Sequence, residues 1–479
     1  MSGDERLRPV LAALTLVTLS LAACSQVETH AQPDAATHLQ TISFGSCWHD
    51  DDHTTRAAMQ RLASQSPDLF LWLGDNVYAD TTDMTEMRST YDTKKYGATY
   101  QPFLQARIPV MATWDDHDFG ENNAGNDYTE RVDSQLEFLR HFDVPSDDVR
   151  YRDVGDGGQA GVYNATLFGS AAQNNRVNVI MLDARYHRSP TFLDYGACQG
   201  SASTMLGDEQ WSWLEQQMEI TSEITVIASG TQVLPPLNRN RPLTDYCAYG
   251  DGTEFNAAIA TLGETYDSGT VYESWAEIPL QRQRLLRLAQ KAVNDGNTKL
   301  VIFVSGDQHW GELLQKTMPA SPAEGAAVIF YEVTASGFDQ DFPEDIASPS
   351  RLPVWADTQG NGSYDARCQL PFGHAGKTYD GCTTAERTAP WCYTQLDASG
   401  NGIPDAWGEC APAGATIPTG KVGAVSDNLS ALTTQDRHII NTPLSKYGTI
   451  AIDWTEHQVT LKLETEAEIA VSTVVPFQP

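Results

Sequence analysis

Lysine and arginine are scarce in this sequence of 479 residues, where 31 basic residues stand against 63 acidic ones and the formal net charge is −32. Nucleic-acid backbones are bound through basic side chains, so we expect no nucleic-acid partner. Plain solubility explains an acidic surface equally well, and the charge identifies no ligand. With 41% hydrophobic and 20% charged residues, the chain is not wholly disordered. Its length allows one large domain or two smaller ones.

Long hydrophobic runs are absent beyond residue 23. The apolar run 10–23 follows Arg6 and Arg8 and is too short for a stable transmembrane helix. It ends in "LSLAAC", which resembles the lipobox of bacterial lipoproteins and implies that Cys24 is acylated; ordinary secretion with cleavage nearby is the alternative. We therefore predict a lipoprotein-type signal peptide at 1–24, a polar linker at 25–38, and export. The protein would be a bacterial cell-envelope lipoprotein, bound to the membrane only through the lipid at Cys24, or a secreted protein.

Cysteines number eight, and export changes how they are interpreted. In an oxidising compartment, an even number of cysteines predicts that they form disulfides. Proximity in the sequence suggests that Cys198 pairs with Cys247 and that the other four pair among themselves. These four are Cys368, Cys382, Cys392 and Cys410. Cys47 is left over and needs another explanation.

Short apolar runs alternate with helical patterns along most of the chain. The runs "LQTISFGS", "LFLWLG", "IPVMATW", "VNVIML", "ITVIAS" and "LVIFVS" suit strands buried on both faces. Residues 209–218 and 281–293 each place apolar side chains on one helical face. The pattern predicts a layered α/β fold that ends in a β-hairpin over 447–464. Residues 338–440 hold four cysteines and little periodicity, so we predict a disulfide-rich insertion between a core at 39–337 and its C-terminal strands at 441–479.

Polar side chains follow each of these apolar runs. In α/β sheets, ligands bind outside the carboxyl ends of strands, so we expect one shared site. Turn and capping preferences would explain one such strand end but not all of them. The residues are Cys47, Asp75, Asn76, Tyr78, Asp116, His117, Asn123, Asp183, Arg185, Arg188, Gln232, Asp307 and His309.

The chemistry of this set indicates a metal site. Carboxylates and imidazoles suit hard divalent or trivalent ions. Cys47 and Tyr78 would add a thiolate and a phenolate, which a highly charged cation holds deprotonated; each alone would more often be a buried structural residue. Paired metals activate water for displacement at phosphorus. Arg185 and Arg188 could then hold phosphoryl oxygens, with Asn123 and Gln232 as further candidates for substrate binding.

The motifs "FGSC", "LGDNVYAD", "WDDHDFGENN", "LDARYHR" and "SGDQH", in this order, resemble the alkaline phosphatase D (PhoD-like) family of metallophosphoesterases. The Asp-x-His motif with which metallophosphoesterases typically begin is absent, and Cys47 stands where the PhoD-like branch has a cysteine. The resemblance implies a β-sandwich flanked by helices and a PhoD-like metallophosphatase core. It also implies iron (Fe3+) at Cys47, Asp75 and Tyr78.

The same resemblance implies calcium (Ca2+) at Asp75, Asp116 and Asp307, with His309 as a further candidate ligand. His117 would be the catalytic histidine that protonates the leaving oxygen, and Asp116 occupies the Asn position of the family's Gly-Asn-His-Asp/Glu motif. We expect Asp115 and Asp118 to support His117 through hydrogen bonds.

A second candidate metal site lies in the insertion, where "DTQGNGSYD" (357–365) and "DASGNGIPD" (397–405) share one pattern. Oxygen ligands at these spacings resemble the acidic calcium repeats of thrombospondin type 3. Tight Asn-Gly turns with solvated acids are the alternative. The candidate ligands are Asp357, Asn361, Asp365, Asp397, Asn401 and Asp405.

We therefore expect an exported, metal-dependent phosphoric ester hydrolase, an alkaline phosphatase or phosphodiesterase that acts on phosphate ester substrates. A calcium-dependent surface-binding protein without catalysis is the alternative, but it needs no Cys, Tyr or Arg at strand ends. A glycosidase with paired carboxylates ranks last, because it leaves Cys47 and the histidines unexplained.

Overall fold

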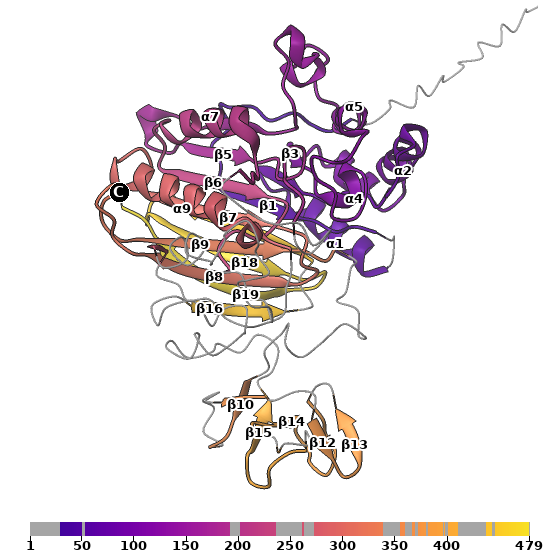
Figure 1. Ribbon diagram of the computed structural model, residues 1–479, viewed down its shortest axis with the longest axis vertical. Coiled ribbons are helices and arrows are strands. Elements are labelled where there is room, and N and C mark those ends of the chain that lie inside the picture. Colours follow the sequence, from indigo (N-terminus) through magenta and orange to yellow (C-terminus); the bar gives the residue numbers. More distant parts are fainter. Residues whose placement is uncertain are drawn as a thin grey trace, which may run out of the picture.

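Two mixed β-sheets form the centre of the molecule, and helices cover their outer faces (Figure 1). The computed structural model describes residues 29–49, 53–191, 202–235, 261–262, 273–338, 355–359, 366–368, 372–379, 382–395, 397, 401–410, 437–442 and 446–478. Cys24, Cys198 and Cys247 lie outside these residues. In the described part of the chain, no helix is long and apolar enough to cross a membrane.

The first sheet has six strands in the order β19-β18-β17-β1-β2-β3. The strands β1 (Thr41–Gly45), β2 (Leu69–Leu73) and β3 (Val110–Thr113) run parallel to one another, with β3 at the edge. The C-terminal strands β17 (Tyr447–Asp453), β18 (Gln458–Glu464) and β19 (Ile469–Pro476) pair antiparallel beside β1. The predicted C-terminal hairpin is confirmed as β17 and β18.

The second sheet has seven strands in the order β16-β8-β9-β7-β6-β5-β4. Its parallel centre consists of β5 (Val177–Met181), β6 (Ile224–Ser229), β7 (Leu300–Ser305) and β9 (Val328–Ala335). Antiparallel strands flank it: β4 (Asn164–Phe168) on one side, and β8 (Gly311–Met318) followed by β16 (Arg437–Thr442) on the other. All the apolar runs that we predicted as strands are strands of these two sheets.

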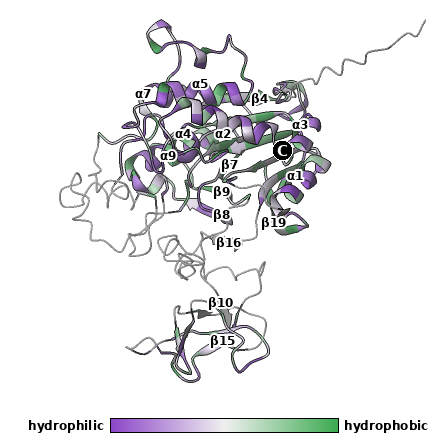
Figure 2. Ribbon diagram, turned by 90° about the vertical axis from the view of Figure 1, so that its right-hand side faces the viewer, coloured by the Kyte–Doolittle hydropathy of each residue, from purple (hydrophilic) through white to green (hydrophobic). Residues whose placement is uncertain are grey.

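Alternating side chains of the strands explain the layers. Leu69, Leu71 and Leu73 of β2 face the second sheet in the shared core, while Phe70 and Trp72 pack under helices on the outer face. Both faces are therefore buried, as continuous apolar runs require. Figure 2 shows the hydrophobic residues gathered on the strands and the hydrophilic ones on the outer sides of the helices.

The helices divide between the two outer faces. Over the first sheet lie α1 (His53–Gln65), α2 (Met84–Tyr96), α3 (Gln101–Gln105), α4 (Asp116–Phe119) and α5 (Arg131–His141). Over the second lie α7 (Gly207–Met218) and α9 (Pro279–Asn294), the two helices that periodicity predicts. Short 3-10 turns comprise η1 (Val149–Tyr151), η2 (Val154–Asp156), η3 (Ala171–Gln173) and η6 (Trp275–Glu277).

The predicted boundaries of the core differ from the structure at two points. His30, in the predicted linker, is 3% exposed, and its Nε2 lies 2.9 Å from the Tyr100 hydroxyl. The amide of Val110 donates to the Ala31 carbonyl at 3.0 Å, so this segment packs along the start of β3. At the other end, the core resumes with β16, before the expected residue 441.

The insertion contains a small module that lies apart from the two sheets in both views (Figures 1 and 2). It has a sheet of β10 (Trp355–Asp357), β11 (Ala366–Arg367), β14 (Trp391–Tyr393) and β15 (Trp407–Cys410), and a hairpin of β12 (Phe372–His374) and β13 (Lys377–Tyr379). Its apolar centre is too small to stabilise it alone, and two disulfides close it.

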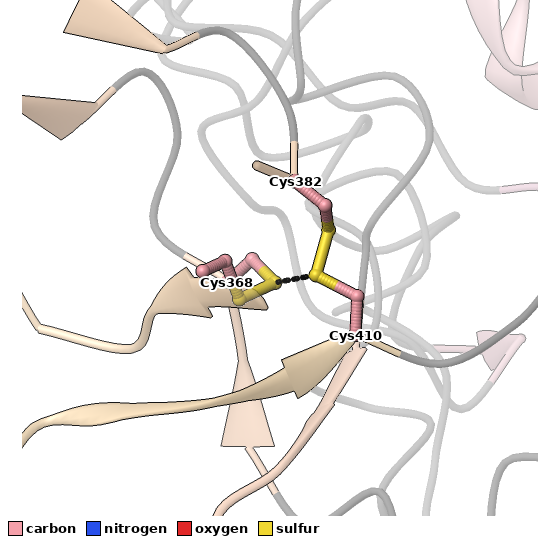
Figure 3. Close-up of side chains that lie close together, drawn as sticks. Cys368, Cys382 and Cys410 are labelled. Carbon is pink, nitrogen blue, oxygen red and sulfur yellow. Dashed lines mark hydrogen bonds between the residues drawn. A yellow bond between two sulfur atoms is a disulfide. The ribbon is translucent and has the colours of Figure 1, made fainter. Parts of the chain in front are cut away.

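The disulfides join Cys368 to Cys392 and Cys382 to Cys410. Figure 3 shows the two bridges side by side, with the Cys368 sulfur 3.9 Å from the Cys410 sulfur. The prediction that these four cysteines pair among themselves is confirmed. Cys47 is a free, buried thiol.

Of the two predicted calcium loops, only the second is largely described. The amide of Asn401 donates to the Asp397 carboxylate at 2.9 Å, and the Asp397 amide donates to the Asn401 carbonyl at 2.8 Å. These bonds are those of a closed turn, while Asp405 lies beyond them with a positive φ of 69°. Asn361 and Asp365 of the first loop lie outside the described residues. Both calcium loops stay predictions.

Candidate metal centre

Five parallel strands end at the same edge of the sandwich and supply most of the site. Cys47 follows β1, Asp75 follows β2 and Asp116 follows β3; from the second sheet, Arg185 follows β5 and Asp307 follows β7. The backbone at several of these ends is strained. Cys47, Asp75, Asp307 and His309 have positive φ angles of 61°, 49°, 67° and 61°, and such strain gathers at functional sites.

The first group of possible ligands surrounds Asp75. Its Oδ2 lies 3.4 Å from the Cys47 sulfur and 3.3 Å from the Tyr78 hydroxyl, which is 3.2 Å from His309 Nε2. Cys47, Asp75 and His309 each offer a ligand atom within 4.8 Å of the others. Burial, followed by the charge of Asp75, raises the pKa of the Cys47 thiol. Burial and the neighbouring Cys47 likewise raise the pKa of Tyr78.

The second group surrounds Asp116. Asp75, Asp116 and His117 form one cluster of ligand atoms within 4.8 Å, and Asp115, Asp116 and Asp307 form another. Burial and the charge of Asp116 raise the pKa of Asp75, and burial and Asp115 raise that of Asp307. Burial opposes ionisation of Asp116 too, but Arg185 and His117 outweigh it and lower the pKa of that carboxyl. These buried carboxylates repel one another, and cations would relieve the repulsion.

His117 faces the site from the start of α4. Its Nδ1 lies 2.7 Å from Asp80 Oδ1, and its ring centroid is 4.2 Å from that of Tyr78. Burial lowers the pKa of His117, but the hydrogen bond to Asp80 and the charges of Asp75 and Asp116 outweigh burial and raise it to about 10. Asp80 and the carboxylates of the cluster therefore favour the protonated form of His117.

The expected roles of Asp115 and Asp118 are wrong, because neither supports His117. Asp118 accepts hydrogen bonds from the amides of Asp75 and Asn76, both at 3.1 Å, and so fixes the turn after β2. Asp115 instead pairs with Arg185, whose Nε donates to its Oδ1 at 2.6 Å. Burial raises the pKa of Asp115 to about 7 in spite of this pair.

Both predicted phosphate-binding arginines are buried at the edge of the carboxylate cluster and share one partner. Arg185 donates through Nη1 and Nη2 to the two carboxylate oxygens of Glu273, at 2.8 and 2.7 Å. Arg188 Nη1 contacts Glu273 as well. Asp183 does not face the cluster: its Oδ1 accepts from the amides of Arg185 and Tyr186 at 2.9 Å and shapes the turn after β5.

The remaining candidates differ in position. Asn123 touches the site through its backbone: its amide donates to Asp116 Oδ2 at 2.7 Å, and its carbonyl accepts from Arg188. Gln232 donates to Glu312 and to the Thr334 hydroxyl, each at 2.8 Å, rather than to a carboxylate of the cluster. Asn76 is also structural, since its side chain donates to the Thr113 carbonyl at 3.1 Å and to Asp118.

Sequence reasoning missed three residues of the site: Asp80, Glu273 and Ser336. The Ser336 hydroxyl lies 3.0 Å from the Cys47 sulfur and accepts from the His309 amide at 2.7 Å. Ser336 directly follows β9, so the strand-end rule would have found it if "VIFYEVTA" had been assigned as a strand. Glu273 follows no strand of the described residues, and nothing in its sequence neighbourhood marks it.

Comparison with known proteins fits this geometry. A model of the PhoD-like phosphatase family matches residues 42–349, which is more than half of the chain. The chain belongs to the PhoD-like phosphatase family. The predicted family and the predicted β-sandwich flanked by helices are thus confirmed.

A solved structure shows the same fold. A structure of PhoD aligns with a TM-score of 0.52 and 14% identity, covering 93% of this PhoD-like chain and 69% of the other. A dimetal phosphatase from Danio rerio aligns with a TM-score of 0.34 and 13% identity over 64% of this chain and 90% of the other, which is too weak to support an argument. No curated protein matches the chain.

The disulfide-bonded module inside this PhoD-like chain has a relative of its own. A model of the fibronectin type II domain matches residues 368–410, from the first module cysteine to the last. A disulfide-bonded domain of this kind suggests an extracellular location.

Proposed function

We propose that this PhoD-like protein is an exported, metal-dependent phosphoric ester hydrolase of the alkaline phosphatase or phosphodiesterase type. The observation that supports it most is the convergence of Cys47, Asp75, Asp116 and Asp307 from four strand ends of two sheets. No such convergence is needed for a surface-binding protein, and the alternative of calcium-dependent binding without catalysis is not favoured by the closed turn at Asp397.

The residues present fit metal ions. Oδ1 of Asp116 and Oδ2 of Asp115 are buried and have no hydrogen-bond partner among the described residues, so each offers an oxygen to a cation. Cys47, Asp75 and Tyr78 would hold iron, and His309 lies with this group rather than with the expected calcium ligands. Asp75, Asp116 and Asp307 would hold calcium. Such ions would supply an activated water and neutralise charge on the phosphoryl group.

The protein's own groups would then handle the proton. Because Nδ1 of His117 faces Asp80, its Nε2 is left to present a proton to the leaving oxygen of the ester. Asp118 holds the backbone of Asp75 in place, and Asp115 orients Arg185 beside Asp116. Arg185 would bind a phosphoryl oxygen through its terminal nitrogens.

A panel of aryl phosphate monoesters and diesters tests the proposal. We predict that the wild-type protein releases the phenol and that Asp75→Ala lowers kcat/KM by orders of magnitude, because Asp75 borders both ligand groups. Asp133→Ala removes an exposed acid of α5 and is the matched control, which should turn over normally. Normal turnover by Asp75→Ala would rule out this site.

We also propose that the exported protein is anchored at the cell envelope through a lipid on Cys24, in line with the lipobox-like "LSLAAC". Incorporation of labelled palmitate into the wild-type protein but not into Cys24→Ser would support the anchor. Equal labelling of both, or labelling of neither, would refute it.

A further inference from the structure

Glu273 is the acidic residue that joins the two arginines of the site. Its side chain is 8% exposed, while those of Arg185 and Arg188 are 0% and 2% exposed. Both of its oxygens accept from Arg185, in the bidentate geometry of a guanidinium with a carboxylate, and Arg188 Nη1 contacts the Oε1 oxygen as well. One carboxylate thus lies between two guanidinium groups.

This carboxylate borders the proposed metal ligands. Arg185 Nη2 lies 3.8 Å from Asp116 Oδ1. The Glu273 carbonyl accepts from Gln308 Nε2 at 2.8 Å, and Gln308 is the neighbour of Asp307 in the chain. The Glu273 side chain therefore lies where Arg185 would present its terminal nitrogens to a phosphoryl group held by metals.

A guanidinium fork matches the oxygens of a carboxylate and of a phosphoryl group equally well. We propose that Glu273 is an internal competitor for the phosphoryl group: its carboxylate occupies the anion position between Arg185 and Arg188, and substrate must displace it. The proposal rests on the proposed function, because it assigns that position to the phosphoryl group of the ester.

Displacement requires only the side chain of Glu273 to rotate. The backbone beside it is fixed, because the Trp275 amide donates to the Gln232 carbonyl at 2.9 Å and Ser274 is bridged to Gln232. The side chain has three rotatable bonds, and its hydrogen-bond and ion-pair partners among the described residues are the two arginines. The competing group can therefore leave while the strand ends stay in place.

The charge of a ligand decides how strongly the two arginines hold it. A doubly charged phosphoryl group gains more from two guanidinium groups than the single charge it displaces. A singly charged phosphodiester carries the same charge as the carboxylate that it displaces and gains no such advantage. The two guanidinium groups therefore favour phosphomonoesters. Glu273 must leave before either kind of ligand binds, so its removal should raise the affinity for both by the same factor.

Calorimetric binding of inorganic phosphate and of dimethyl phosphate to the metal-loaded protein at about pH 8 tests the proposal. If Glu273 covers the arginines in about nine of ten molecules, Glu273→Gln binds phosphate about tenfold more tightly. Dimethyl phosphate should gain by the same factor as phosphate. Unchanged or weaker phosphate binding would overturn the proposal and leave Glu273 as a structural partner of Arg185.

Glu223→Gln is the matched control, because Glu223 pairs with Arg176 at 3.1 Å, is 4% exposed in its side chain and precedes β6 at the opposite end of the strands. Glu223→Gln should leave phosphate affinity unchanged. If it tightens phosphate binding as much as Glu273→Gln does, the gain comes from net charge alone, and the proposal is overturned. If Glu273→Gln fails to fold, Glu273→Asp retracts the carboxylate and should also tighten phosphate binding; no tightening overturns the proposal.

Binding is measured without turnover, so the two proposals fail separately. Tighter phosphate binding by Glu273→Gln in a protein that hydrolyses no ester would refute the phosphatase and keep the anion position. Turnover by the wild-type protein, together with unchanged phosphate affinity in Glu273→Gln, would refute the internal competitor and support the phosphatase.

Discussion

His117 lies between carboxylates that affect its imidazole from different sides. Cations bound at Asp75 and Asp116 would offset the charge of both, whereas Asp80 contacts Nδ1 at 2.7 Å and keeps its effect. With cations bound, Asp80 would thus be the group that favours the protonated form of His117. The sequence could not reveal this pair, since the contact joins residues 37 positions apart and depends on how the turn after β2 meets α4.

We predict that Asp80→Asn lowers kcat on the order of tenfold, as the loss of a supporting carboxylate typically does. Asp80 raises the pKa of His117 by favouring its protonated form, so removing its charge lowers that pKa. The acid form is then lost at lower pH, and the alkaline limb of the kcat profile shifts downward. A pH profile of kcat checks this; an unmoved limb would show that His117 is not the proton donor.

Cys47, Asp75 and Asp307 could be identified from sequence because each directly follows a continuous apolar run. The strand-end rule places a residue at an edge of the sheet but gives no partner for its side chain. Arg185 was therefore assigned to phosphate, while its partners Asp115 and Glu273 appeared only in the structure. Contacts between distant segments of this kind depend on packing that no local pattern encodes.

At the scale of elements, close packing of strand ends gives the site its shape. Gly74, after β2, has a φ of 101°, and a Cβ there would lie 2.6 Å from the Asp115 amide nitrogen. A Cβ on Gly230, after β6, would lie 2.5 Å from Asp115 Oδ1. The two sheets approach Asp115 this closely only because both positions lack a side chain.

We predict that Gly230→Ala displaces the Asp115 carboxylate from Arg185 and destabilises the fold by about 1–3 kcal/mol, the usual cost of overpacking. Urea unfolding gives the stability, and kcat/KM should fall as well because Arg185 loses its support. Gly155→Ala is the control, since nothing lies within 4 Å of its added Cβ. Wild-type stability in Gly230→Ala would show that Asp115 moves without cost.

Strands were predicted more completely than helices for a physical reason. The strands β2, β3, β5, β6 and β7 are buried along their whole length and are therefore continuous apolar runs. Helix α2 buries only Met87, Tyr91 and Lys95 along one side. A lysine in that stripe, whose Nζ donates to the His141 carbonyl and to Asp143 at 2.6 Å, hides the helical periodicity.

At the scale of the whole molecule, the disulfide-bonded module and the metal centre belong to different parts of the chain. The module has its own apolar cluster of Phe372 and Trp391 with its four cysteines. Every residue of the candidate centre comes from the two large sheets and the segments that connect their strands. Catalysis should therefore not depend on the module.

We predict that Cys382→Ser with Cys410→Ser destabilises the module by about 2–5 kcal/mol, as loss of a native disulfide in a small domain does. Calorimetry should show a lowered transition for the module and an unchanged one for the sheets. Hydrolysis of an aryl phosphate should stay close to the wild-type rate. A collapse of turnover in the double variant would show that the module is part of the active unit.

The central claim is that a metal centre built on Cys47, Asp75, Tyr78, Asp116 and Asp307 hydrolyses phosphate esters. Elemental analysis and aryl phosphate turnover on one purified sample test it directly, before chelation, after chelation and after metals are returned. We predict bound iron and calcium, loss of turnover with their removal and recovery on their return. Undiminished turnover by the metal-free protein, or zinc as its only metal, would contradict the claim.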